Sequence, residues 1–234
     1  MVRSRKELSM ALSRLQGFAN PKRRLEQYPT DPDTASALLW SAHMLGDIYG
    51  RAVADLGCGT GILSYGAFLL GARDVICIDI DSDAVYVASR NLGGNAFIHL
   101  VVSDVRLLSL RGVDTVVMNP PFGVVRRGAD IEFLRVALRI AREAVYTIHK
   151  FNEESNAIIV REAVLHGFKP SIIDVRDIAI PAMYERHRRK VHRFRVALYV
   201  MKRVRSHVAE QENSDARRTL MRRGRVHAGA RNLP

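Results

Sequence analysis

Short apolar runs alternate with longer amphipathic stretches along residues 51–166. Helical spacing of apolar residues predicts helices, whereas short continuous apolar runs predict buried strands. The expected strands are Val53–Leu56, Val75–Ile80, Ile98–Val102, Val113–Met118 and Val145–His149, and the expected helices are Ile62–Leu70, Asp83–Leu92, Ile131–Ala144 and Asn152–His166. Apolar strands separated by helices of about 10–15 residues indicate a parallel, doubly wound sheet.

The two ends of the chain depart from this alternation. Ser171–Ile178 and Val191–Met201 predict two strands without a helix between them, and therefore an antiparallel hairpin. Residues 1–27 are basic and have leucines at helical spacing, and a second helix is expected from an Asp33 cap through about Tyr49. The expected fold class is α/β, with a Rossmann-like, seven-stranded, mostly parallel sheet and a C-terminal antiparallel hairpin.

The chain has 234 residues, a formal net charge of +12 and a pI near 10.3. Such an excess of basic residues favours a polyanionic partner such as nucleic acid, although a soluble protein with a heavily charged surface could have the same composition. Cys58 and Cys77 are the only cysteines, so we expect neither a disulfide framework nor a metal site. Because nothing resembles a signal peptide and no run of 18 apolar residues occurs, a cytoplasmic location is expected.

A glycine-rich loop follows the first strand, with the sequence Asp55-Leu56-Gly57-Cys58-Gly59-Thr60-Gly61. Glycines at such a turn let the backbone approach a ligand closely, but a dinucleotide pyrophosphate would be repelled by Asp55. A ligand that carries an ammonium group, such as S-adenosylmethionine, tolerates this carboxylate, so we expect Asp55 to contact the cofactor and to line one crevice with Asp79 and Asp104. Asp79 ends the second strand and can accept both ribose hydroxyls, with Asp81 as a rival, and Asp104-Val105 is placed to contact adenine. The ordinary alternatives are a turn residue at Asp79 and a helix cap at Asp104.

The turn after the fourth strand reads Asn119-Pro120-Pro121-Phe122. Two prolines make this turn rigid, so the Asn119 side-chain oxygen and the Pro120 carbonyl can be held as acceptors for an exocyclic amino group. Two acceptors favour a pyramidal nitrogen whose lone pair can attack a sulfonium methyl group, and Phe122 would stack on a flipped base. An ordinary Asn-Pro turn is the alternative reading.

With these residues, the chain resembles the NPPF-type adenine-N6 methyltransferases of small-subunit ribosomal RNA, in an archaeal form of the methyltransferase-like protein five family. The resemblance covers about residues 20–202 and includes the segment Leu25-Glu26-Gln27-Tyr28-Pro29-Thr30. Basic composition predicts an N-terminal extension (1–27) and a mobile C-terminal tail (203–234), the latter outside the resemblance. The resemblance implies a class I methyltransferase fold over residues 28–202. It also implies a small zinc-binding activator protein, catalysis by Asn119–Phe122, and cofactor contacts from Gln27, Thr30, Gly57, Thr60, Ile62, Asp79, Asp104 and Val105.

A basic segment lies before the last strand. Its cations include Arg186, Arg188, Arg189 and Lys190, and Tyr184 and Phe194 flank it. Cations and aromatic residues together favour RNA binding through phosphate contacts, although a charge run is often only a solvated face.

Three other functions share parts of these patterns. A protein glutamine-N5 methyltransferase uses a similar Asn-Pro-Pro turn, because an amide is also planar, but needs no basic surface. A DNA adenine methyltransferase would carry a large target-recognition domain, for which this chain has no room. A non-catalytic RNA-binding assembly protein would need neither Asp79 nor Asn119. The sequence therefore favours N6-methylation of an adenosine in RNA.

Overall fold

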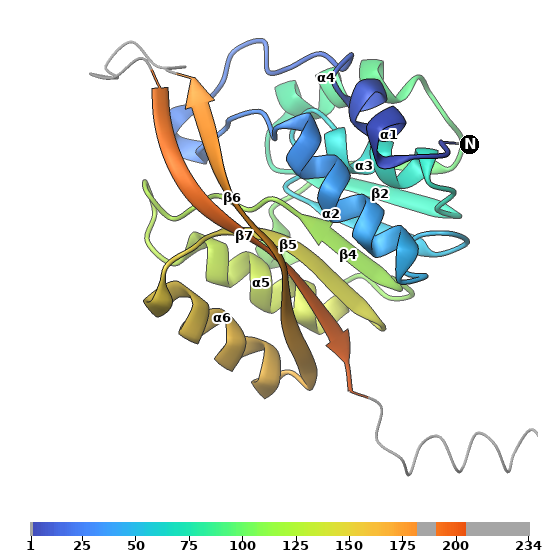
Figure 1. Ribbon diagram of the computed structural model, residues 1–234. Helices are drawn as coiled ribbons and strands as arrows, with labels where there is room; N and C mark the ends of the chain where they lie inside the picture. The colour runs from blue at the N-terminus through green and yellow to red at the C-terminus, as the bar shows by residue number, and fades with distance from the viewer. Residues whose placement is uncertain (1, 182–190, 205–234) are drawn as a thin grey trace, which may run out of the picture. The chain divides into compact units, whose positions relative to one another are not determined.

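The computed structural model describes residues 2–181 and 191–204, and the compact unit spans Met1–Arg203 (Figure 1). Its seven-stranded sheet has the order β3-β2-β1-β4-β5-β7-β6. The strands are β1 Ala52–Leu56, β2 Asp74–Asp79, β3 Ile98–Val102, β4 Thr115–Met118, β5 Ala144–Lys150, β6 Phe168–Pro181 and β7 Val191–Arg203. The first five are parallel, and β7 lies antiparallel between β5 and β6. The predicted fold class is confirmed.

Six α-helices and two short 3₁₀ helices connect these strands in the described part of the chain. They are α1 Arg5–Leu12, α2 Pro32–Met44, α3 Ile62–Leu69, α4 Ser82–Leu92, α5 Ala129–Ile140 and α6 Glu153–Leu165, with η1 Arg23–Leu25 and η2 Val105–Leu107. The expected start and end of α2 were wrong. Asp31 rather than Asp33 is the cap, because Pro32 occupies the first helical position and Asp31 accepts the Thr34 amide at 2.8 Å. The helix ends at Met44, before Tyr49.

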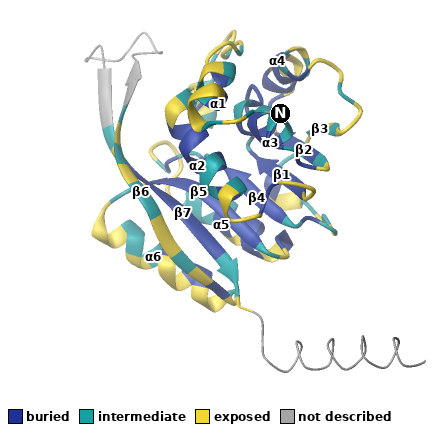
Figure 2. Ribbon diagram, turned by 45° about the vertical axis from the view of Figure 1, so that its right-hand side comes forward, coloured by how far each residue is buried: buried dark blue, intermediate teal, exposed yellow. Residues whose placement is uncertain are grey.

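Two apolar layers cover the two faces of the sheet, as the alternation of side chains along each strand requires. On β1, Val53 packs in the layer of α1, α2 and α3, whereas its neighbour Ala54 packs in the layer of α5 and α6. Val117 and Val116 of β4 divide in the same way. The central strands are consequently buried throughout, as Figure 2 shows. Functional side chains must therefore lie at the strand ends.

The N-terminal helix shares this core. Leu8 and Leu12 of α1 are fully or almost fully buried in the same cluster as Leu39 of α2. The division of the chain at residue 27 stays a prediction, and the basic tail beyond residue 204 lies outside the described residues. The described part contains no helix that is long and apolar enough to cross a membrane.

Candidate active site

The glycine loop after β1 adopts backbone angles that side chains disfavour. Gly57, Gly59 and Gly61 have φ values of 69°, 54° and 88°. A Cβ atom on Gly57 would lie 2.9 Å from the Phe133 ring, and one on Gly59 would lie 2.8 Å from the Phe18 ring. Both the positive φ and the close approach of an aromatic ring thus require glycine at these two positions.

Asp79 closes this loop from the end of β2. Its carboxylate accepts the Gly59 amide at 2.8 Å and the Asp81 amide at 2.9 Å. Burial raises the pKa of Asp79, and the two amide hydrogen bonds oppose that rise. The carboxylate keeps further lone pairs for a ligand, since each oxygen accepts only one of these amides.

The rival carboxylate, Asp81, has a different environment. It is the N-cap of α4 and accepts hydrogen bonds from Lys22 and from the Gln27 amide group, the latter at 2.7 Å. Burial opposes a low pKa for Asp81, but the hydrogen bond from Lys22 lowers it below its usual value. Asp79 lines the cavity beside the glycine loop, described below, and Asp81 does not. The geometry therefore favours Asp79 as the ligand contact.

A cavity of about 310 Å³ lies beside the glycine loop, within the size range of small-molecule sites. The eight residues that the resemblance implies as cofactor contacts all line it: Gln27, Thr30, Gly57, Thr60, Ile62, Asp79, Asp104 and Val105. Asp55, which was also expected to contact the cofactor, does not line it. Instead, Asp55 is buried and accepts the Ser64 amide and hydroxyl, and burial raises the pKa of Asp55 to about 7.

The acceptor turn meets the same cavity through Asn119 and Pro121. The Asn119 Nδ2 atom donates to the Thr30 hydroxyl oxygen at 2.9 Å. The other end of this amide, Oδ1, is buried and has no hydrogen-bond partner among the described residues. Because a buried acceptor without a donor is costly, this oxygen is suited to receive a hydrogen from a bound molecule.

Phe122 points away from the cavity. The ring is 8% exposed and packs against Tyr28 and Phe194, with ring centroids 5.1 and 6.1 Å apart. Pro120 beside it is also buried. Stacking of Phe122 on a base stays a prediction, and in the present geometry its ring instead anchors the turn against the Tyr28 segment.

Cys58 and Cys77 form a disulfide across the base of the glycine loop. We expected no disulfide framework, and the bond within this single pair was not predicted. Parallel pairing of β1 with β2 brings the two Cα atoms to 5.4 Å, although they are 19 residues apart in sequence. Among the described residues, no group of three or more His, Cys, Asp or Glu side chains could hold a metal ion.

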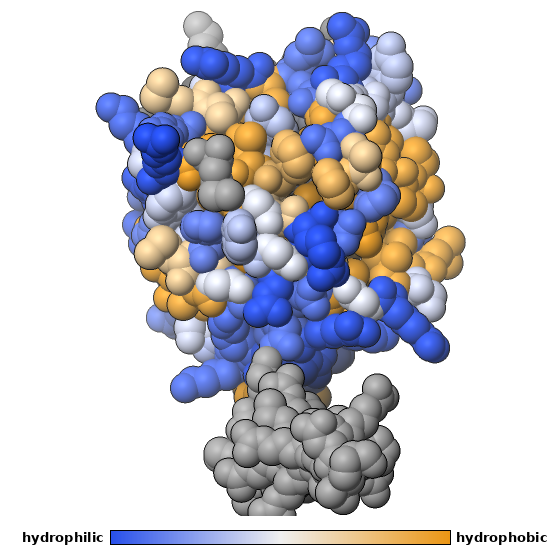
Figure 3. All heavy atoms as spheres, turned by 90° about the vertical axis from the view of Figure 1, so that its right-hand side faces the viewer, coloured by the Kyte–Doolittle hydropathy of each residue, from blue (hydrophilic) through white to orange (hydrophobic). Residues whose placement is uncertain are grey.

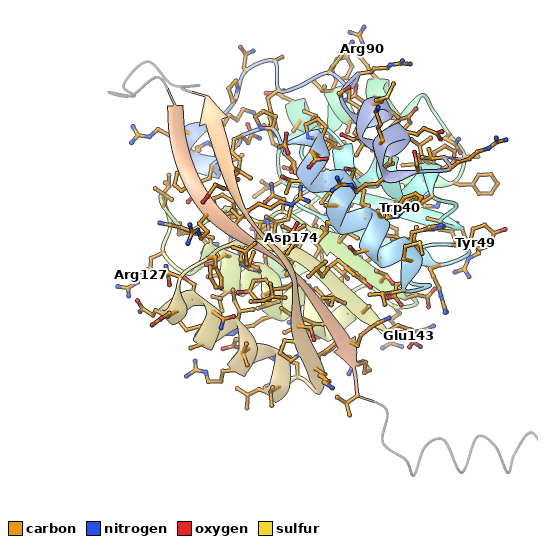
Figure 4. The ribbon with its side chains drawn as sticks, in the orientation of Figure 1. Trp40, Tyr49, Arg90, Arg127, Glu143 and Asp174 are labelled. Atoms are coloured by element: carbon orange, nitrogen blue, oxygen red, sulfur yellow. A yellow bond between two sulfur atoms is a disulfide. The ribbon has the colours of Figure 1, made fainter. Side chains whose placement is uncertain are left out.

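Arginine side chains surround the mouth of the cavity. Arg24, Arg106 and Arg126 line it, and Arg127 reaches outward from the loop before α5 (Figure 4). Arg106 pairs with Asp104, and this hydrogen-bonded cation lowers the pKa of Asp104. Asp104 also caps η2, so the helix-cap reading and a place in the cavity are both correct for it. The predicted RNA-binding residues Arg186, Arg188, Arg189 and Lys190 lie outside the described residues.

Sequence reasoning missed four residues that shape this site. Phe18 and Phe133 close the glycine loop, Tyr28 packs on Phe122, and Glu26 contacts the loop after the acceptor turn. The only available signal was the resemblance over residues 25–30. It includes Glu26 and Tyr28 but gave neither of them a role.

Comparison with known proteins matches residues 29–153 to the methyltransferase small domain family. The chain is 37% identical over 192 residues to the rRNA N(6)-adenosine-methyltransferase METTL5 of Danio rerio, covering 79% of this chain and 92% of that protein. It is 36% identical to a protein of the archaeon Methanocaldococcus jannaschii, covering 83% and 92% of the two chains. The crystal structure of a Pyrococcus horikoshii protein, assigned as an RNA methyltransferase, superposes with a TM-score of 0.80 at 45% identity, covering 88% of this chain and all of that one.

Proposed function

Since this chain belongs to the methyltransferase small domain family and, within it, to the rRNA N6-adenosine methyltransferases related to METTL5, we propose that it methylates N6 of an adenosine in RNA with S-adenosylmethionine as cofactor. The observation that carries this proposal is the Asn119 Oδ1 atom, a buried acceptor without a partner at the edge of the cavity. It lies on the turn whose rigidity and acceptor groups suit a planar amino nitrogen.

The cavity fits the cofactor. Gly57 and Gly59 line it, and the Phe133 and Phe18 rings pack against these two glycines. In this proposal Asp79 accepts the ribose hydroxyls and Asp104 and Val105 contact the adenine, and all three line the cavity. Gln27 and Thr30 would complete the site from the N-terminal segment. When bound, S-adenosylmethionine supplies an electrophilic methyl group.

The residues of the turn act on the acceptor nitrogen. Its lone pair is delocalised into the adenine ring, so the nitrogen is a poor nucleophile. Asn119 Oδ1 and the Pro120 carbonyl accept hydrogen bonds from its two N–H groups and favour the pyramidal form. In that form the nitrogen lone pair is free to attack the methyl group, and one N–H proton is released afterwards. Thr30 holds the side-chain amide of Asn119 so that Nδ2 faces the Thr30 hydroxyl and Oδ1 faces the adenine amino nitrogen. Positioned dipoles of this kind lower the barrier without a strong base.

The finer proposal is that the substrate is small-subunit ribosomal RNA. The basic composition and the arginines at the cavity mouth support a polyanionic substrate. The test is methyl transfer from labelled cofactor to isolated 16S RNA, to 23S RNA, to DNA and to ribosomal protein, followed by nucleoside analysis, with Asn119→Ala as the control. We expect N6-methyladenosine in 16S RNA alone. Label in protein would instead indicate glutamine-N5 chemistry, and cofactor binding without label in any substrate would indicate an assembly protein.

We also propose that a small zinc-binding activator protein covers the β3 edge of the sheet. Among the described strands, β3 pairs with β2 alone, and apolar side chains in and before it are exposed: Phe97, Leu100 and Val102 by 58%, 38% and 55%. Apolar patches appear on this side of the molecule in Figure 3. Such surfaces are typical of protein interfaces. Phe97→Ser with Val102→Ser should abolish co-purification of the activator, and its retention would move the interface elsewhere.

A further inference from the structure

The segment Glu26–Thr30 runs between the cofactor side and the acceptor side of the cavity. Glu26, Tyr28 and Thr30 contact Val125, Phe122 and Asn119, which all belong to the acceptor turn and the loop that follows it. Gln27, which alternates with them, contacts Asp81 beside the glycine loop. All five residues of the segment line the cavity, and Glu26, Tyr28 and Thr30 in addition contact the acceptor turn or its following loop.

Glu26 makes the least ordinary contact of this segment. It is the only described residue other than glycine with a positive φ, at 51°. Its side chain is 8% exposed. Oε1 accepts the amides of Val125 and Arg126 at 2.6 and 3.4 Å, across about 100 residues of chain. Oε2 is buried and has no hydrogen-bond partner among the described residues.

This arrangement is costly to the fold. A left-handed backbone is unfavourable at a non-glycine residue, and a buried carboxylate needs compensating hydrogen bonds. Here the compensation consists of two backbone amides, both from the loop Gly123–Gly128 between the acceptor turn and α5. That loop has exposed Val124 and Val125, which give it little apolar anchoring of its own. Among the described residues, the Glu26 carboxylate and the exposed Glu132 carboxylate are the side chains that hydrogen-bond this loop, and only Glu26 bonds its backbone.

We propose that Glu26 is a positioning residue that fixes the loop Gly123–Gly128 and, with it, the acceptor turn. The predicted change in kcat rests on the proposed function, whereas the effect of Glu26 on the loop does not. Glu26 is joined in the chain to Gln27, which contacts the cofactor side, so filling of the cavity steadies the Glu26 carboxylate and the loop it holds. Cofactor binding accordingly prepares the acceptor turn before RNA arrives.

The test compares Glu26→Ala and Glu26→Gln with the wild-type chain. The first readout is amide hydrogen exchange at Val125 and Arg126, with and without S-adenosylmethionine. In the wild type, cofactor should slow exchange at both amides. In Glu26→Ala, exchange should be about tenfold faster, and cofactor should no longer slow it. Glu26→Gln should lie between the two, because its amide oxygen still accepts a hydrogen bond but carries no charge.

The second readout separates positioning from general stability. We expect kcat with saturating RNA to fall about 10- to 100-fold in Glu26→Ala, with the cofactor Kd changed by less than about twofold. Glu132→Gln is the matched control. It removes a carboxylate that pairs with the Arg126 side chain on the same loop, but this pair is solvent-exposed and its loss should change kcat by less than about twofold.

Two results would overturn the proposal. Unchanged exchange at Val125 and Arg126 in Glu26→Ala would show that the loop holds itself. A parallel loss of cofactor affinity, melting temperature and kcat would show that Glu26 only stabilises the fold. Because exchange and cofactor binding need no RNA, they test Glu26 even if wild-type protein fails to methylate RNA, a failure that would count against the proposed function alone.

Discussion

The hydrogen bond from Asn119 to Thr30 makes a sharp prediction about catalysis. Thr30→Val keeps the shape of the side chain and removes the oxygen that accepts the Asn119 Nδ2 hydrogen at 2.9 Å. The side-chain amide of Asn119 is then free to rotate, so Oδ1 faces the methyl-accepting nitrogen in only a fraction of the molecules. The effect of Thr30 on turnover should therefore act through Asn119.

The magnitudes follow from the two contacts. A neutral hydrogen bond contributes about 0.5–1.5 kcal/mol, so Thr30→Val should lower kcat by about 2- to 13-fold. Asn119→Ala removes a preorganised acceptor and should lower kcat by about 10²–10³-fold. In the double variant, Thr30→Val has no amide left to orient and should cost almost nothing further.

The assay is a double-mutant cycle on single-turnover methyl transfer with saturating RNA and cofactor. The cofactor Kd is measured in parallel by calorimetry, since Thr30 also lines the cofactor cavity. Additive losses in the double variant would refute the orienting role of Thr30. Residual activity of Asn119→Ala within a few-fold of wild type would refute the acceptor role of Asn119.

Three further predictions concern the cofactor site and the basic segment. Burial raises the pKa of Asp55 from 3.8 to about 7, so its contribution to stability is full below about pH 4 and is lost as the pH rises through 7. Asp55→Asn should remove a penalty on the order of 4 kcal/mol above pH 7, and an unfolding free energy that differs from wild type equally at pH 4 and pH 8 would contradict this. Asp79→Ala should weaken cofactor binding by roughly 1.5–3 kcal/mol in calorimetry while the protein stays folded, and unchanged affinity would exclude a ribose contact. Replacing Arg188, Arg189 and Lys190 together by Ala should lower the salt slope of RNA binding by about two to three units without changing cofactor affinity, whereas an unchanged slope would assign these residues to ordinary surface.

Local sequence patterns were sufficient to predict the strands and helices, and the strand ends at which functional residues lie. A short continuous apolar run indicates a buried strand, and apolar residues at helical spacing indicate a helix, so Val53–Leu56 and Ile62–Leu70 could be predicted without knowledge of their neighbours. Parallel strands place their carboxyl ends at one edge of the sheet. Asp55, Asp79 and Asp104 were therefore predicted to line one crevice; Asp79 and Asp104 line the cavity, whereas Asp55 does not. Helix ends were less certain, because caps such as Asp31 depend on single side chains.

Contacts between distant parts of the chain decided the rest. The sequence could not say that Asp55 turns toward Ser64, that Asp81 is taken by Lys22 and Gln27, or that strand pairing joins Cys58 to Cys77. It also could not show that Phe122 packs against Tyr28, or that Glu26 holds an amide 99 residues away. Each of these depends on which side of a strand end or turn faces which neighbour. That choice is made by the packing of whole elements, and no local periodicity encodes it.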